Sequence, residues 1–149
     1  MEPDIEQMVR ELWDRDRIAR VPRTYARGID RRDWELVRSC FTDDAHIEGS
    51  RATAPVDAYV AQLRPGVEYF PVTMHFMGNQ LIDLDGDRGE VDTYAVAYHW
   101  KSEQAGGAHP ENLVVGIRYH DIVVRHGEGW LIAHRHVDPD WRRGPYPPV

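Results

Sequence analysis

The sequence predicts an α+β fold in which N-terminal helices close a curved antiparallel sheet shaped as a conical half-barrel. Helical periodicity is confined to residues 4–63, and from residue 71 onward the pattern is that of long strands joined by turns. Strands of about a dozen residues exceed the usual length, so we expect bulges or glycines to bend them. A bent sheet has a concave face, and this face predicts a pocket.

The first expected helix covers residues 4–20. Its apolar residues recur at steps of three and four, as in an amphipathic helix, at Ile5, Met8, Val9, Leu12 and Trp13. Pro22 lacks a backbone donor and disfavours helical geometry in the residue before it. We therefore expect the helix to break or kink at Pro22 and to restart through Tyr25 to Gly28, which would re-aim Tyr25.

Two shorter helices and one strand are expected before residue 71. Asp33 is suited to cap the second helix, which residues 42–44 would end. The apolar face of this helix would consist of Trp34, Val37 and Phe41. A strand over residues 45–51 leads to a third helix over residues 55–63, which Pro65-Gly66 would stop.

The remaining chain reads as two long hairpins. Residues 72–84 pair with 88–101 across Asp85-Gly86, and residues 112–125 pair with 130–137 across a Gly-Glu-Gly turn. Residues 104–111 contain two glycines and a proline and are expected to form a connection near one rim.

The chain is expected to form one domain over residues 1–149. Three prolines near its end predict a C-terminal arm, at about residues 141–149, that stays outside the sheet interior.

Composition limits the classes of partner. The 18 Lys and Arg residues are outnumbered by 25 Asp and Glu residues, and the net charge of −7 argues against nucleic acid or an anionic membrane as partner. Cys40 is the single cysteine, so no intrachain disulfide is possible. Neither a signal peptide nor an apolar run of about 20 residues is present, and a cytoplasmic location is expected.

Strict alternation in residues 88–101 separates a face of small residues from a face of aromatic ones. The small face carries Val91, Thr93, Ala95, Ala97 and His99, and the aromatic face carries Tyr94, Val96, Tyr98 and Trp100. If the small face points inward it leaves room for a ligand; alternatively, a helix packs closely on the alanines and His99 lies at the surface. The aromatic face is suited to a subunit interface, so we expect a homodimer or homotrimer.

Three residues could perform acid/base chemistry. His75 has the large apolar neighbours Met74, Phe76 and Met77, and an imidazole in such surroundings with one acid partner can act as a general base. A hydrogen-bonded core histidine is the alternative. Tyr25 and Asp30 flank Gly28 and could direct a phenol and a carboxylate into one cavity. Alternatively, Asp30 caps the next helix beside Asp33.

A second group of histidines invites a metal hypothesis. His134 and His136 share one strand face, and His120 could join them. Without a third ligand at a recognisable spacing, a polar strand edge is the better interpretation, and we expect no metal site. The sequence also has no phosphate loop, nucleophile elbow or dinucleotide fingerprint, so no cofactor is expected.

The sequence resembles the SnoaL-like branch of the nuclear-transport-factor-2-like superfamily, and within it most closely the scytalone dehydratases and bile-acid dehydratases. The resemblance is carried by YARGIDRRDWELVRSCFTDDA, MHFMGNQLIDLDGDRGEVDTYAVAYHW and RYHDIVVRHGEGWLIAHRHVDPDW, which together cover most of the chain. It implies a cystatin-like cone and an acid/base enzyme that needs no cofactor. The superfamily hosts many functions, however.

The resemblance also implies roles for single residues. Asp30 would orient the catalytic His75, Tyr25 would bind substrate, and His99 would be a second pocket histidine. Ile117 and Tyr119 stand where scytalone dehydratases have a small hydroxyl and an amide, which makes the pocket more apolar. The substrate-binding residues are then expected to be Met77, Ala95, Ala97, Ile117 and Tyr119.

The expected reaction is dehydration of a small apolar molecule, such as a cyclic hydroxy-ketone or a polyketide-like or steroid-like compound. Two alternatives stay open. One is an isomerase or polyketide cyclase that uses the same proton abstraction. The other is a non-catalytic protein that binds a small ligand or serves as an accessory subunit of an oxygenase.

Overall fold

A computed structural model describes residues 4–104 and 106–149 of the chain. Within these residues, six strands form one sheet in the order β2-β1-β6-β5-β4-β3, in which only β1 and β6 run parallel. The elements in chain order are α1 (Ile5–Arg31), α2 (Trp34–Ser39), β1 (Phe41–Glu48), β2 (Thr53–Pro55), α3 (Val56–Glu68), β3 (Val72–Asp85), β4 (Arg88–Trp100), β5 (Leu113–His126) and β6 (Gly129–Arg143).

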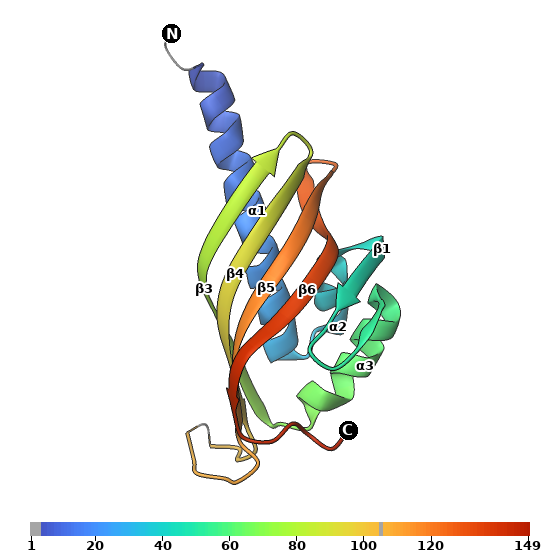
Figure 1. Cartoon of the computed structure of the whole chain (residues 1–149), viewed down its shortest axis with the longest axis vertical. Coiled ribbons are helices and arrows are strands. Elements are labelled where there is room, and N and C mark those ends of the chain that lie inside the picture. Colours follow the sequence, from blue (N-terminus) through green and yellow to red (C-terminus); the bar gives the residue numbers. More distant parts are fainter. Residues whose placement is uncertain (1–3, 105) are drawn as a thin grey trace.

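The sheet curves around α1, with α2 and α3 beside the end of the sheet formed by β1 and β2 (Figure 1). The predicted α+β cone is therefore confirmed, and the sheet does not close into a barrel. Bulges bend it as expected, because the register shifts after Met77 in β3 and after Gly116 in β5. At Gly116 the indole of Trp141 lies 2.1 Å from where a Cβ would stand, so only glycine allows this close approach.

The expected break at Pro22 is wrong, because α1 continues through this residue to Arg31. An internal proline costs about 3 kcal/mol. Four side chains on one stripe of α1 are buried against the sheet, and burial of each contributes about 1.5–3 kcal/mol, which offsets the loss. They are Ile18, Val21, Tyr25 and Ile29. The first three turns of α1 project beyond the sheet, so their apolar residues are exposed (Figure 1).

The shorter elements differ from expectation at their ends. Asp33 caps α2 as predicted and accepts the N–H of Leu36 at 3.0 Å. Phe41, however, begins β1 instead of continuing the helix, because its backbone pairs with Ile132 of β6. Pro65 does not stop α3, which runs on to Glu68. The short strand β2, which pairs with β1, was not predicted.

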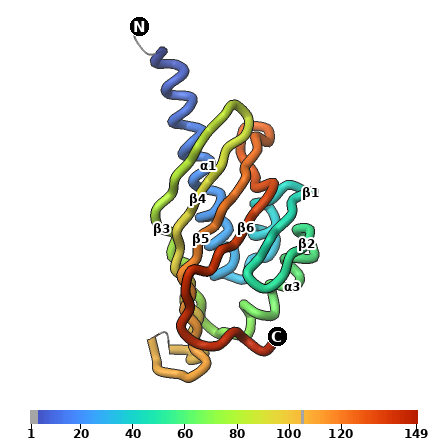
Figure 2. The backbone as a smooth tube through the Cα atoms, viewed as in Figure 1, coloured from blue at the N-terminus to red at the C-terminus, as the bar shows by residue number. Residues whose placement is uncertain are grey.

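Both predicted hairpins are confirmed. Gly86 and Gly127 occupy their turns with φ values of 60° and 57°, a region that favours glycine. β6 continues through Arg143, so the first three residues of the expected arm pair with β5. Residues 144–149 leave the sheet and return beside α3 (Figure 2), where Pro147 lies 3.8 Å from the position of a Cβ at Gly66. Over the described residues, no helix combines the length and apolar composition needed to cross a bilayer.

Candidate active site

A cavity lies between the concave face of the sheet, α1 and α3. Together with the open space at its mouth it encloses about 720 Å³. Apolar and aromatic side chains make up most of its wall, namely Tyr25, Ile29, Tyr59, Leu63, Val67, Phe70, Ala97, Leu113, Val115, Ile117, Tyr119 and Val137. The charged or titratable groups in the wall, besides the phenols, are Arg51, His75 and His99.

His75 reaches this cavity because of the alternation along β3. Met74 and Phe76 point to the outer face and are 58% and 63% exposed, whereas the His75 side chain is 7% exposed and lines the cavity. Its Nδ1 atom lies 2.8 Å from Oδ1 of Asp30. Nδ1–H is then the donor to the carboxylate, and Nε2, on the opposite side of the ring, is left as an acceptor for a ligand.

Asp30 is fixed at the last turn of α1 by several groups. Its Oδ2 accepts the backbone N–H of His75 at 2.8 Å, and its Oδ1 also accepts the hydroxyl of Thr73 at 3.0 Å. Burial acts to raise the pKa of the Asp30 carboxyl, but the bonds and charge of His75 and the hydroxyl of Thr73 outweigh it and lower the pKa. Asp30 therefore stays ionised beside the imidazole, and Asp33, not Asp30, caps the next helix.

Arg32 ties this end of α1 to the start of β3. It adopts a left-handed backbone with φ of 57°. Its guanidinium donates to the carbonyl of Asp30 at 2.9 Å, to the Thr73 hydroxyl at 2.9 Å and to the carbonyl of Phe70 at 2.6 Å. The helix end and the strand that carry the two members of the pair are thus held together directly.

His99 lies on the small face of β4, which points inward as one of the two alternatives predicted. Its ring centroid is 5.4 Å from that of His75, and its Nδ1 donates to the carbonyl of Leu113 at 3.2 Å. The pKa of His99 is lowered to about 4, mainly by burial and to a smaller extent by the nearby His75. At neutral pH this imidazole is uncharged and presents Nε2 as an acceptor.

Three phenols form the deeper wall. Tyr25, Tyr59 and Tyr119 are buried and line the cavity. Burial, reinforced by the neighbouring phenols, raises the pKa of Tyr25 and outweighs the opposing effect of Arg135. Tyr25 is therefore a protonated hydrogen-bond donor at neutral pH.

A buried ion pair supports these phenols and was missed by sequence reasoning. Arg135 donates from Nε and Nη2 to Asp121 at 2.7 and 2.8 Å, and both side chains are fully buried. The guanidinium lies 4.3 Å from the ring centroid of Tyr25 and 4.4 Å from that of Tyr119. Asp121 and Arg135 occupy facing positions on β5 and β6, so opposite charges on the inward side of both strands were the available signal.

The remaining predicted residues divide into two groups. Ala97, Ile117 and Tyr119 line the cavity as expected. Ala95 and Met77 do not; they pack in the apolar core next to it. Several cavity residues come from segments that were given no site role, such as Tyr59 and Val67 of α3 and Tyr146 of the arm. The four-residue spacing of Tyr59, Leu63 and Val67 could have marked that face of α3.

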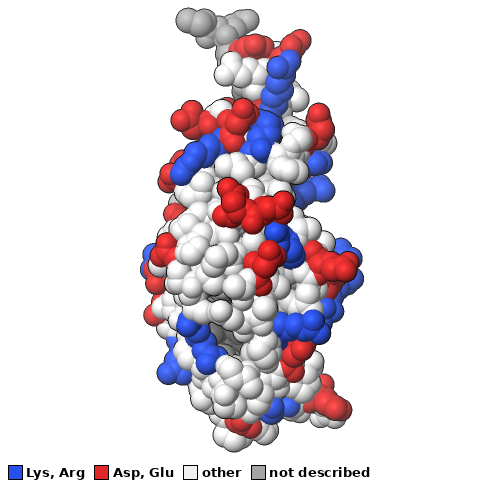
Figure 3. All heavy atoms as spheres, turned by 90° about the vertical axis from the view of Figure 1, so that its right-hand side faces the viewer, with Lys and Arg blue, Asp and Glu red and all other residues white. Residues whose placement is uncertain are grey.

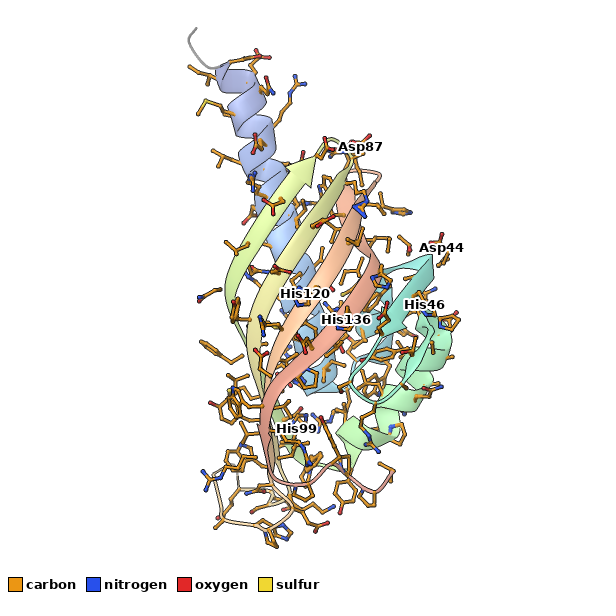
Figure 4. All side chains as sticks on the ribbon, viewed as in Figure 1. Asp44, His46, Asp87, His99, His120 and His136 are labelled. Carbon is orange, nitrogen blue, oxygen red and sulfur yellow. The ribbon has the colours of Figure 1, made fainter. Side chains whose placement is uncertain are left out.

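The other histidines lie away from the cavity. His120 and His136 lie higher on the sheet than His99 (Figure 4). They are the strand neighbours of the inward-pointing Asp121 and Arg135, so their own side chains point to the outer face. His134 and His136 both bond Glu48, at 3.0 and 3.1 Å, and His120 bonds Asp92 at 2.5 Å. Within residues 4–104 and 106–149, no three His, Cys, Asp or Glu side chains are gathered as a metal ion would require.

Comparison with known proteins places this chain in a family. A model of the SnoaL-like domain matches residues 10–136. An uncharacterized protein of Mycobacterium tuberculosis is 28% identical over 131 residues, which are 85% of this chain and 86% of that protein.

Two solved structures show the same fold. A candidate scytalone dehydratase of Novosphingobium aromaticivorans has a TM-score of 0.79 at 21% identity, covering 93% of this chain and 92% of that one. A hexachlorocyclohexane dehydrochlorinase has a TM-score of 0.74 at 15% identity, covering 93% and 96%. At these identities the likeness concerns the fold alone. The family match spans most of α1 and both members of the His75–Asp30 pair, and the chain therefore belongs to the SnoaL-like domain family.

Proposed function

We propose that the protein is an acid/base lyase that removes water from a small apolar cyclic β-hydroxy ketone, of the polyketide or steroid type. The observation that carries this proposal is the 2.8 Å contact between His75 Nδ1 and Asp30 Oδ1 in the wall of an apolar cavity. A base of this kind removes a proton from carbon when the resulting enolate is stabilised. The two proteins of similar fold are named for a dehydration and a dehydrochlorination, and both are eliminations.

The first step breaks the C–H bond next to the carbonyl. The proton passes to Nε2 of His75, and the electron pair moves onto the carbonyl oxygen as an enolate. The imidazolium that forms is stabilised by Asp30, whose carboxylate already accepts Nδ1–H. General base catalysis contributes about 10²–10⁴-fold to the rate.

The enolate oxygen needs a donor, and the phenols are the candidates. Tyr25 is buried and remains protonated because its pKa is raised. Its ring lies 4.3 Å from the Arg135 guanidinium, whose positive charge strengthens the phenol as a donor. Tyr25 is therefore assigned to stabilise the enolate.

The second step expels the β-hydroxyl group. The enolate electron pair forms the C=C bond, the C–O bond breaks, and protonated His75 returns its proton to the departing oxygen, so that water leaves. His99 presents an uncharged Nε2 and can accept the hydroxyl hydrogen of the substrate, which orients the leaving group.

An isomerase or cyclase reaction is the second candidate. Of the two cavity imidazoles, only His75 is bonded to a carboxylate, while His99 is bonded to a backbone carbonyl. A single base suffices when a proton merely moves between two carbons or when an enolate closes a ring. Mass spectrometry distinguishes the candidates, because only dehydration removes a water from the substrate.

The test is an assay of purified protein against monocyclic to polycyclic β-hydroxy ketones, read by enone absorbance and by mass. His75→Ala should lower turnover by about 10²–10⁴-fold without altering the circular dichroism spectrum. His120→Ala is the matched control, since this imidazole is also bonded to an aspartate but lies on the outer face, and it should keep full turnover. Full turnover in His75→Ala contradicts the proposal. Ligand retention without turnover on any substrate favours a binding protein.

A further inference from the structure

The wall of the cavity contains no carboxylate among the residues that the structure describes. This is unexpected for a protein with 25 acidic residues and a net charge of −7. Figure 3 shows acidic side chains spread over the face that carries α3, whereas basic side chains lie beside the hollow in that face. Asp30 lies behind His75 and is already bonded to it. An anionic ligand would thus enter without meeting an unpaired negative charge.

Arg51 is the cation in the wall that is free to bind such a ligand. It lies between β1 and β2, and its guanidinium stacks over Tyr146 at 5.4 Å and donates once, from Nη1 to the carbonyl of Pro147 at 3.3 Å. A guanidinium has five N–H groups. Within the described part of the chain, Arg51 forms no ion pair, unlike Arg38, Arg118 and Arg125, which are all bonded to carboxylates.

The position of Arg51 also fits a role in binding. Together with Ser50, Tyr59 and Leu63 it lines both the inner cavity and a second, outer groove that continues past Gln62. It therefore lies where the inner cavity meets the outer groove. A planar guanidinium at such a junction matches a carboxylate in a bidentate arrangement.

We propose that Arg51 binds a carboxylate at one end of the substrate, whose apolar rings extend into the cavity toward His75. The substrate class is then an apolar cyclic β-hydroxy ketone that also carries a carboxylate, rather than an uncharged one. The identity of the reacting end rests on the proposed function, but the binding of the carboxylate does not.

The experiment compares naphthoate with naphthamide, an uncharged molecule of nearly the same shape, by isothermal titration calorimetry. Wild-type protein should bind naphthoate about tenfold more tightly than naphthamide, because a charge-assisted pair is formed only with the acid. Arg51→Gln should abolish this preference by weakening naphthoate alone. High salt should reduce the preference of the wild type as well.

Two variants separate the possible outcomes. Arg142→Gln is the matched control, because Arg142 stacks on the same Tyr146 ring at 4.7 Å and donates to the carbonyl of Gly144 but lies outside the cavity wall. It should keep the preference. His75→Ala should also keep it, so that loss of catalysis and loss of carboxylate binding are distinguishable. The proposal is overturned if wild type binds both probes equally or neither, or if Arg51→Gln weakens both alike.

Discussion

Asp30 contacts His75 through both of its carboxylate oxygens, one on the imidazole Nδ1 and the other on the backbone N–H, each at 2.8 Å. The side chain therefore positions the strand and the ring together. An asparagine puts a donor NH2 group in place of one of these two oxygens, so one of the two donors of His75 loses its acceptor.

Asp30→Asn is accordingly expected to lower kcat by about 10²-fold or more, because the imidazole loses its orientation and the stabilisation of its charged form. The measurement is kcat on a responsive β-hydroxy ketone, with the circular dichroism spectrum as a check on folding. Thr73→Val removes the hydroxyl bonds to Asp30 and Arg32 but leaves both contacts of Asp30 with His75 in place, and it should have a much smaller effect. Equal losses in the two variants would show that the carboxylate acts only by anchoring β3.

The burial of His99 predicts a pH-dependent stability. In the unfolded chain its imidazole takes up a proton near pH 6.5, but in the folded protein its pKa is lowered to about 4. Between these values the unfolded state binds more protons, so the free energy of unfolding falls as the pH is lowered.

His99→Phe should lose this part of the pH dependence, because phenylalanine fills the site beside Phe70 without an ionisable group. The measurement is the free energy of unfolding of both proteins in urea between pH 7 and pH 4. The lower limit corresponds to the pKa of about 4 that His99 has in the folded protein. His126→Phe, at an exposed position, is the control and should keep the wild-type dependence. An unchanged slope in His99→Phe would contradict the assignment.

Local patterns in the sequence predicted most of the fold. Alternation in β4 correctly placed Ala97 and His99 on one face, which points inward as one of the two alternatives held, and the turns at Gly86 and Gly127 correctly separated the long strands. The predicted break at Pro22 and the predicted helix end at Pro65 were wrong. The rule that proline interrupts a helix considers one lost hydrogen bond and not the burial of α1 and α3 against the rest of the protein. Pro22 and Pro65 both lie within helices.

The candidate site was predictable only where one segment carried the signal. The pairing of His75 with Asp30 followed from the family resemblance, since residues 45 positions apart show no local sign of contact. The Arg135–Asp121 pair and Arg51 were missed because their surroundings come from several elements. Charge pattern alone does not tell a buried arginine from a solvated one.

Removal of Arg135 should destabilise the protein strongly. Arg135→Met would leave Asp121 charged, fully buried and without its partner, which costs about 3–5 kcal/mol in typical buried pairs. The double variant Arg135→Met/Asp121→Leu should recover part of that loss, because no uncompensated charge remains. Arg118→Met, which breaks the exposed Arg118–Asp140 pair, is the control and should cost far less, because water screens the charges of an exposed pair. The measurement is the free energy of unfolding in urea for the two single variants, Arg135→Met and Asp121→Leu, and for the double variant. A loss in the double variant equal to the sum of the two single losses would contradict the coupling between Arg135 and Asp121.

The outer face of the sheet predicts self-association. Phe76, Tyr94 and Trp141 are 63%, 47% and 52% exposed and line one shallow groove across β3 to β6, although apolar side chains of this size are usually covered. We expect a homodimer or homotrimer that buries this groove. Light scattering at micromolar protein concentration should therefore give two or three times the mass of one chain. Phe76→Glu should yield monomers with an unchanged circular dichroism spectrum, because a carboxylate would be desolvated in the interface. Ala58→Glu, at an exposed position of α3, should leave the oligomer intact. A monomeric wild type would remove this expectation, and the exposed rings would then remain in contact with water.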